Sequence, residues 1–263
     1  MLLLTGLIVF AGCSDDDADI EYVLAWSDEF DGPAGNPPDP EKWTYDIGRG
    51  NNGWGNAELQ YYTDRTENAA LDGDGHLVIT AIEESFGSAD YTSARLKTQN
   101  IFSQRYGRFE ARIKLPRGQG IWPAFWMLGD DIRIVGWPQC GEIDVMEYLG
   151  QDADTVYGTV HGPGFSAGQS IGESFSLPNS DFDVDFHVFA VEWTETRIIW
   201  SVDGDVFHVV TPQTQGLDEW VFDDPFFMIL NVAVGGYWPG EPDASTRFPQ
   251  TMEIDWVRVY RAN

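Results

Sequence analysis

Basic residues are scarce in this chain. Its 263 residues include 15 Lys and Arg against 43 Asp and Glu, which gives a formal net charge of −28 at pH 7. A surface of this charge repels phosphate backbones and anionic lipid headgroups. The composition therefore excludes nucleic acid and an anionic membrane surface as partners, and it suits a salty or extracellular setting.

Cysteine is nearly absent, with only Cys13 and Cys140. Cys13 closes the stretch "LLLTGLIVFAGC", which is as long as a signal-peptide core and too short to span a bilayer. Small residues followed directly by Cys resemble a bacterial lipoprotein signal, in which cleavage before the Cys is followed by lipidation of its thiol. We therefore predict a signal peptide over 1–12, lipidation of Cys13 and no disulfide. A plain secretory peptide is the alternative.

No linker, repeat or low-complexity run follows the acidic stretch after Cys13. We predict a solvated tether over 13–23 and one domain over 24–263. The protein is expected to be a monomer outside the cytoplasm, secreted or lipid-anchored at the bacterial cell surface or in the periplasm. Its only expected membrane contact is the lipid anchor.

A helical period is also missing, because no stretch sustains a 3.6-residue repeat free of Gly and Pro. Alternation takes its place: in "YGRFEARIKLP" every second residue is apolar. Asp203-Gly204 predicts a hairpin turn between two strands. "FFMILNVAV" is apolar on both faces, and Asn231 within it favours a polar cleft on one of them. The pattern predicts an all-β sandwich of two antiparallel sheets with a concave cleft.

The stretch "GEIDVMEYLG" places Glu142, Asp144 and Glu147 within six positions of one strand. On a regular strand Glu142 and Asp144 share a face, but Glu147 turns to the other face and into the core. A β-bulge near Val145 and Met146 would restore Glu147 to the face of Glu142. We expect the bulge, because a buried charge without partners is costly.

With the bulge, we expect the two Glu carboxyl groups to lie about 5–5.5 Å apart, as in a retaining glycosidase; an inverting pair is about 6.5–9.5 Å apart. Crowding negative charges raises the pKa of one carboxyl and so supplies the acid that this reaction needs. Asp144, between the two Glu residues, can adjust that balance by hydrogen bonding. The pattern therefore predicts cleavage of a glycosidic bond.

Nine stretches between Trp26 and Tyr260 resemble, in order, segments of glycoside hydrolase family 16 in its laminarinase-like form. They are "WSDEFDG", "NNGWGNAELQYYT", "YTSARLKT", "YGRFEARIKLP", "IWPAFWMLG", "WPQCGEIDVMEYLG", "GTVHGPG", "ILNVAVGGYWPG" and "FPQTMEIDWVRVY". The resemblance implies a β-jelly roll that hydrolyses β-1,3-glucan internally with retention. It implies Glu142 as nucleophile, Asp144 as its helper and Glu147 as acid/base.

The resemblance also implies the residues that contact the glucan and a structural calcium, with no cofactor for catalysis. The glucan contacts are Asn56, Arg95, Trp122, Trp126, His161 and Trp238, and the calcium ligands are Glu29, the Gly75 carbonyl and Asp255. The alternatives are core positions for Trp122 and Trp126, a structural role for His161 and a surface ion pair for Arg95. Trp137 fits a rim or a core position equally, and Cys140 fits a buried filler.

Two other functions fit parts of the pattern. A non-catalytic β-glucan-binding jelly roll would keep the Trp residues but would not need Glu142 and Glu147. A related hydrolase of mixed-linkage glucan or of a sulfated algal galactan would keep the carboxylates. Sulfate recognition favours several Arg or Lys residues, which are scarce here. The sequence therefore favours an endo-hydrolase of a neutral β-1,3-glucan.

Overall fold

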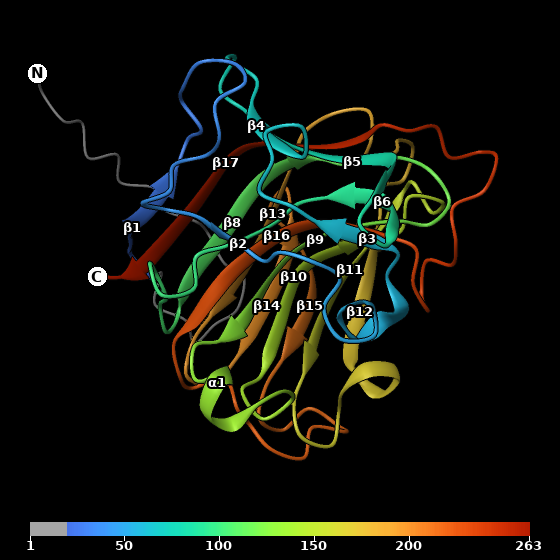
Figure 1. The fold of residues 1–263 in the computed structure, drawn as a ribbon. Helices are drawn as coiled ribbons and strands as arrows, with labels where there is room; N and C mark the ends of the chain where they lie inside the picture. The colour runs from blue at the N-terminus through green and yellow to red at the C-terminus, as the bar shows by residue number, and fades with distance from the viewer. Residues whose placement is uncertain (1–19) are drawn as a thin grey trace, which may run out of the picture.

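The computed structural model describes residues 20–263. The predicted signal peptide, Cys13 and most of the predicted tether lie outside the described residues. β1 (Tyr22–Asp28) begins two residues before the expected start of the domain and pairs with β17 (Gln250–Ala262). The two ends of the described chain therefore lie side by side (Figure 1). Within the same residues, no helix reaches the length and apolarity needed to cross a membrane.

Strands account for most of the regular structure, and three short helical turns account for the rest. The other strands are β2 (Thr44–Tyr45), β3 (Gln60–Tyr62), β4 (Ala69–Leu71), β5 (Leu77–Phe86), β6 (Ala89–Ser93), β7 (Arg95–Lys97), β8 (Gly107–Lys114), β9 (Ile121–Gly129), β10 (Glu142–Tyr148), β11 (Thr155–His161), β12 (Ile171–Ser176), β13 (His187–Trp193), β14 (Ile198–Val202), β15 (Asp205–Val210) and β16 (Phe226–Val234). The turns are η1 (Gly53–Ala57), α1 (Ile132–Val135) and η2 (Ala167–Gln169).

The strands form the two sheets of a jelly-roll sandwich, as predicted (Figure 1). One sheet has seven strands in the order β12-β11-β10-β9-β16-β7-β2. The other has ten: β15-β14-β13-β8-β17-β5-β6-β3 in order, with β1 on β17 and β4 on β5. Among the described strands, β3 and β6 form the one parallel pair. The predicted hairpin is confirmed, since Asp203 and Gly204 join β14 to β15 with φ angles of 52° and 90°.

The core lies between the two sheets and follows the predicted alternation. Phe109, Ala111 and Ile113 of β8 are fully buried in it. All nine residues of β16 are buried, because its second face is covered as well. Part of that second face belongs to a small separate cluster of Leu128, Cys140, Phe227 and Ile229, against which Trp126 and Ile132 pack. We call the face of the seven-stranded sheet that points away from the core the outer face.

Candidate active site

Strand β10 contains the predicted bulge. Its register with β9 shifts between Asp144 and Met146, and its register with β11 shifts between Asp144 and Glu147. Val145 and Met146 are consecutive, yet both are buried in the main core. Because two successive side chains point inward, Glu147 returns to the outer face with Glu142 and Asp144. The alternative, a Glu147 side chain directed into the core, is wrong.

A tryptophan of the opposite sheet supports this bulge. Trp200 of β14 is fully buried, and its Nε1 donates to the carbonyl oxygen of Asp144 at 2.8 Å. A bulge leaves backbone groups without ladder partners, and a buried carbonyl without a partner is costly. Gly158 of β11 leaves room for the ring, since a Cβ there would lie 2.5 Å from the Trp200 ring. Neither residue was predicted to serve the site.

Each glutamate accepts a hydrogen bond from an indole. Trp137 Nε1 donates to Glu142 Oε2 at 2.8 Å, and Trp122 Nε1 donates to Glu147 Oε1 at 3.2 Å. His161 of β11 lies beside the carboxylates, with its Nε2 3.2 Å from Asp144 Oδ2 and 3.7 Å from Glu142 Oε1. Trp137 is 44% exposed, so it lies at the rim of the site and not in the core.

Burial and mutual repulsion raise the proton affinity of both glutamates. Burial and the charge of Asp144 raise the pKa of Glu142 to about 8, against the opposing effect of His161. Burial, Asp144 and Glu142 raise the pKa of Glu147 well above its usual range. Burial alone would lower the pKa of His161, but Asp144 and both Glu residues together raise it to about 9. At neutral pH the site therefore combines a cationic imidazole with a coupled pair of glutamates that holds on to a proton.

The predicted aromatic contacts divide into two groups on the outer face. Arg95 contacts two indoles, with its guanidinium carbon 4.7 Å from the Trp54 ring centroid and 4.6 Å from that of Trp126. Trp238 packs edge-on against Trp122, with 5.6 Å between ring centroids. Tyr157 also packs against Trp238, with 4.9 Å between their ring centroids. Both β9 indoles are only partly buried, so neither is a core residue.

Asn56 is exposed on η1 and joins the site from another segment. Its carbonyl oxygen accepts the Tyr237 N–H at 2.9 Å, which fixes η1 to the loop that carries Trp238. Its side-chain amide donates to Glu58 at 3.3 Å. The structure also adds Trp54 and Tyr157, which were not predicted. Their side chains stack or pack against predicted residues from distant segments, and no sequence spacing signals such contacts.

Cys140 is a buried filler, as expected. It is 2% exposed and belongs to the small cluster beneath α1. Burial and the charge of nearby Glu142 raise the pKa of its thiol to about 12. A thiol that stays protonated at neutral pH is a poor nucleophile. Its role is to pack the loop that brings Trp137 to Glu142.

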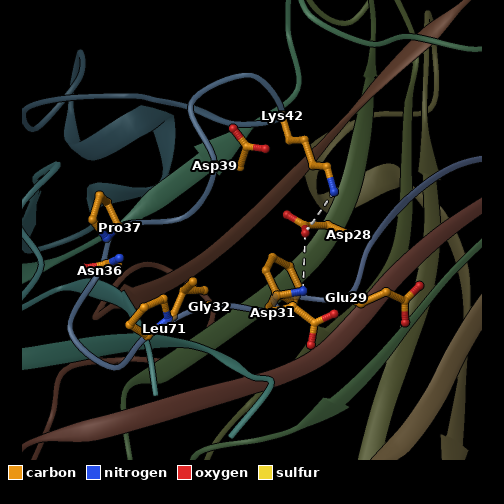
Figure 2. A pocket seen from close by; sticks show the side chains of 11 residues that line it. Asp28, Glu29, Asp31, Gly32, Asn36, Pro37, Asp39, Lys42 and Leu71 are labelled. Atoms are coloured by element: carbon orange, nitrogen blue, oxygen red, sulfur yellow. Dashed lines mark hydrogen bonds and ion pairs between the residues drawn. The ribbon is translucent and has the colours of Figure 1, made fainter. Parts of the chain in front are cut away.

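The residues expected to hold calcium have other partners. Glu29 forms two hydrogen bonds with Arg258, at 3.0 and 2.7 Å, and Asp255 is paired with Arg112. Glu29 also lines the pocket of Figure 2, whose lining residues include neither Gly75 nor Asp255. Both carboxylates are therefore neutralised by guanidinium groups, and the arrangement fits two ion pairs better than a calcium site.

Within residues 20–263, the one group of three potential metal ligands is Glu142, Asp144 and His161, whose ligand atoms lie within 4.8 Å of one another. The contact between imidazole and carboxylates explains this proximity without an ion. A β-sandwich that presents two protonatable glutamates, an aspartate between them and flanking indoles on one face defines a glycoside hydrolase.

Comparisons with known proteins agree. The family model described as glycosyl hydrolases family 16 matches residues 54–258, and the chain belongs to this family. A β-glucanase of Rhodothermus marinus is 44% identical over 271 residues, which cover 97% of this chain and 92% of that protein.

Solved structures are similar over almost the whole domain. The laminarinase catalytic domain of Thermotoga petrophila RKU-1 is 53% identical, with a TM-score of 0.88, and the match covers 93% of this chain and 99% of that one. An endo-β-1,3-glucanase of Pyrococcus furiosus is 49% identical, also with a TM-score of 0.88, over 93% of this chain and 96% of that one. The fold and the family membership are thus independently supported.

Proposed function

We propose that the protein is a retaining endo-hydrolase of β-1,3-glucan. The observation that carries the proposal is the bulged strand β10, which brings Glu142 and Glu147 to one face in a family 16 fold. Relatives over nearly the full chain are a β-glucanase and structures named as a laminarinase and an endo-β-1,3-glucanase. The reaction needs no cofactor, because two carboxyl groups supply both the nucleophile and the proton.

The surrounding charges support different roles for the two glutamates. Glu142 is influenced by two cations, His161 and Arg95, and both lower its pKa. The pKa of Glu147 is raised by the negative charges of both Asp144 and Glu142, against the lowering effect of His161. Glu142 is therefore better suited to be ionised and Glu147 to hold the proton. We assign Glu142 as nucleophile, Glu147 as acid/base and Asp144 as the residue that holds His161 and balances the pair.

The reaction then proceeds in two displacements. Glu142 attacks the anomeric carbon, the bond to the leaving sugar breaks, and Glu147 gives its proton to the leaving oxygen. In the second step Glu147 takes a proton from water, the water oxygen attacks the same carbon, and the bond to Glu142 breaks. Two inversions give net retention. The indoles of Trp122 and Trp137 hold the two carboxyl groups in place by hydrogen bonds.

The alternatives are weaker. A sulfated galactan needs cations on the outer face, but Arg95 and Lys97 of β7 both contact Asp46. A purely glucan-binding protein does not require two glutamates with raised pKa values.

The test is a product profile on laminarin, lichenan and agarose. We expect internal cleavage of laminarin with a ladder of oligosaccharides; binding without release of reducing ends would favour the binding protein, and faster cleavage of agarose would favour the galactanase.

For the segment before residue 20 we propose a lipoprotein signal, lipidation of Cys13 and a tether that holds a monomeric catalytic domain outside the cytoplasm. The support is the apolar run that ends directly at Cys13. The protein should partition with membranes, and Cys13→Ala should release it or block its processing. An unmodified thiol in a soluble protein would contradict the lipid anchor.

Structural calcium at Glu29, Gly75 and Asp255 stays a proposal. Carboxylate and carbonyl oxygens suit calcium, but the ion would have to displace Arg258 and Arg112 from these carboxylates. If calcium binds, chelation should lower the melting temperature, because the ion stabilises only the folded state. A melting curve that does not respond to chelator would assign both carboxylates to their arginine partners.

A further inference from the structure

Two glutamine side chains hold the loop that carries Trp238. We call residues 235–240 the Trp238 loop. Gln119 Nε2 donates to the Pro239 carbonyl oxygen at 2.6 Å, and Gln151 Nε2 donates to the same oxygen at 3.1 Å. A carbonyl oxygen has two lone pairs and can accept both bonds. Because Gln119 precedes β9 and Gln151 follows β10, one carbonyl joins the loop to two other connecting segments.

These two bonds matter because the loop has little packing of its own. Between residues 236 and 247, Pro239 is the one buried residue. Both glutamines line a polar cavity of about 390 Å³, together with Asp243 and Ser245 of the chain that follows the loop. Hydrogen bonds, more than apolar contacts, therefore fix the position of Pro239 and of its neighbour Trp238.

Trp238 connects these bonds to the proposed acid/base. Its ring lies edge-on against Trp122, with 5.6 Å between the ring centroids and 87° between the ring planes. Trp122 Nε1 donates to Glu147 Oε1 at 3.2 Å. Burial and the charges of neighbouring carboxylates raise the pKa of Glu147, and this hydrogen bond opposes them. The orientation of the Trp122 indole therefore affects how firmly Glu147 holds its proton.

We propose that Gln119 and Gln151 are positioning residues for proton transfer by Glu147. By holding the Trp238 loop against Trp122, they keep the indole N–H on the acid/base. This inference rests on the proposed function, since it concerns the same glutamate. It gives the two amides overlapping roles, because either donor alone still anchors the Pro239 carbonyl. Loss of one glutamine should therefore have little effect, and loss of both should release the loop.

The experiment compares Gln119→Met, Gln151→Met and the double variant in the full chain, because Met keeps the length of the side chain without its donors. The substrates are phenyl and dinitrophenyl β-laminaribiosides, which share their sugars but differ in their need for a proton on the leaving oxygen. The double variant should lower kcat/KM for the phenyl glycoside about three- to tenfold, the worth of one hydrogen bond. It should stay within about twofold of the wild type on the dinitrophenyl glycoside, whose leaving group needs little protonation. Each single variant should stay within about twofold on both substrates, since one donor remains.

A pH profile separates this role from a general loss of stability. Glu147 acts first as an acid and is active while protonated, so the rate falls as pH rises through its pKa. The double variant weakens the bond that lowers this pKa, so the basic limb of kcat/KM for the phenyl glycoside should move up by roughly 0.5–1 pH unit. Trp238→Ala removes the ring between the loop and Trp122, and it should move the same limb in the same direction. A less stable fold alone would lower the rate without moving the limb.

Gln104→Met is the matched control. Gln104 Nε2 also donates to backbone carbonyls, those of Tyr106 and Tyr260 at 2.8 and 3.1 Å, but Tyr260 belongs to β17 in the other sheet. This variant should lower stability without moving the basic limb or separating the two glycosides. An unmoved limb in the double variant or in Trp238→Ala, equal losses on the two glycosides, or a single variant as impaired as the double variant would overturn the proposal. Should the double variant fail to fold, Gln151→Met combined with Gln119→Asn, whose amide is one methylene shorter, is judged by the same criteria.

The proposed function is tested separately by the wild type. If the wild type cleaves neither laminarin nor either glycoside, the hydrolase assignment fails. The NMR signal of the Trp122 indole N–H then still tests the two glutamines, because this group contacts Glu147 and its signal follows the titration of that carboxyl. A titration midpoint that rises in the double variant supports the positioning role, and an unchanged midpoint contradicts it.

Discussion

At the scale of single residues, Glu147 tests the division of roles. On laminarin, Glu147→Ala should lower kcat by about 10²- to 10⁴-fold, because the leaving oxygen receives no proton. On an aryl glycoside with a good leaving group, the glycosyl-enzyme should still form. Added azide, which needs no base, should restore turnover and give the β-glycosyl azide, as judged by NMR.

Two controls complete this prediction. Glu142→Ser should abolish hydrolysis on both substrates, with no rescue that gives a β-product. Glu83→Ala removes an exposed carboxyl on β5 and should leave activity intact. Azide rescue of the Glu142 variant with an α-product would reverse the assignment, and an α-anomer as the first product of the wild type would make the enzyme inverting.

His161 should govern the acid limb of the pH profile. Its pKa of about 9 makes it a cation at neutral pH, and this cation lowers the pKa of Glu142. The nucleophile is active when ionised, so activity falls as pH drops through its pKa. His161→Gln removes the cation, and the acid limb of kcat/KM should move to higher pH by roughly one unit.

The control for His161 is His187, which also contacts an aspartate, Asp203, at 2.7 Å but on the other sheet. His187→Gln should leave the pH profile in place. An acid limb that moves to lower pH in His161→Gln, or does not move, would contradict the conclusion that the His161 cation lowers the pKa of the nucleophile.

At the scale of elements, the effect of the bulge in β10 can be tested separately from the effect of the Met146 side chain within it. Deleting Met146 restores a regular strand and moves Glu147 along β10 by one residue, about 3.3 Å. We expect kcat to fall at least about 10²-fold, because misplacement of a reacting group by 1 Å already has an effect of that order. Circular dichroism should show a folded protein.

Met146→Ala is the matched control, since it keeps the register. Met146 is fully buried, so the truncation should cost about 2–5 kcal/mol in the free energy of unfolding. At a temperature where the variant is folded, its kcat should stay close to that of the wild type. Similar activity losses in both variants would show that core packing, and not register, sets the positions of the carboxyl groups.

The strands of this protein could be predicted from sequence to different extents. Alternation identified β8, and Asp203-Gly204 identified the hairpin, because both signals are local. The five-residue spacing of Glu142 and Glu147 indicated the bulge, since only an inserted residue returns both to one face. The support for the bulge from Trp200 was not predictable, because it joins strands more than fifty positions apart. The same reason hides the hydrogen bonds of the buried Glu58, whose partners come from η1 and β3.

At the scale of the whole molecule, the excess of 28 negative charges opposes the compact state. Screening weakens this repulsion, so raising NaCl from 10 to 500 mM should raise the melting temperature by roughly 3–8 °C, as measured by calorimetry. Choline chloride at the same ionic strength should act equally, because screening does not depend on the cation. A response to one salt alone would indicate a bound ion, and a falling melting temperature would contradict the repulsion.

The hydrogen bond from Trp200 to the Asp144 carbonyl joins the two sheets directly at the catalytic strand. Strand β14, which carries this indole, follows β10 by about fifty residues. A nascent chain in which the Glu-x-Asp-x-x-Glu motif is already synthesised therefore still lacks the Trp200 indole, which supports the bulge. The support for the bulge is thus complete only when the second sheet closes on the first. Hydrolytic activity therefore depends on the closed sandwich, and we expect a partly assembled molecule that lacks the Trp200 hydrogen bond to be inactive.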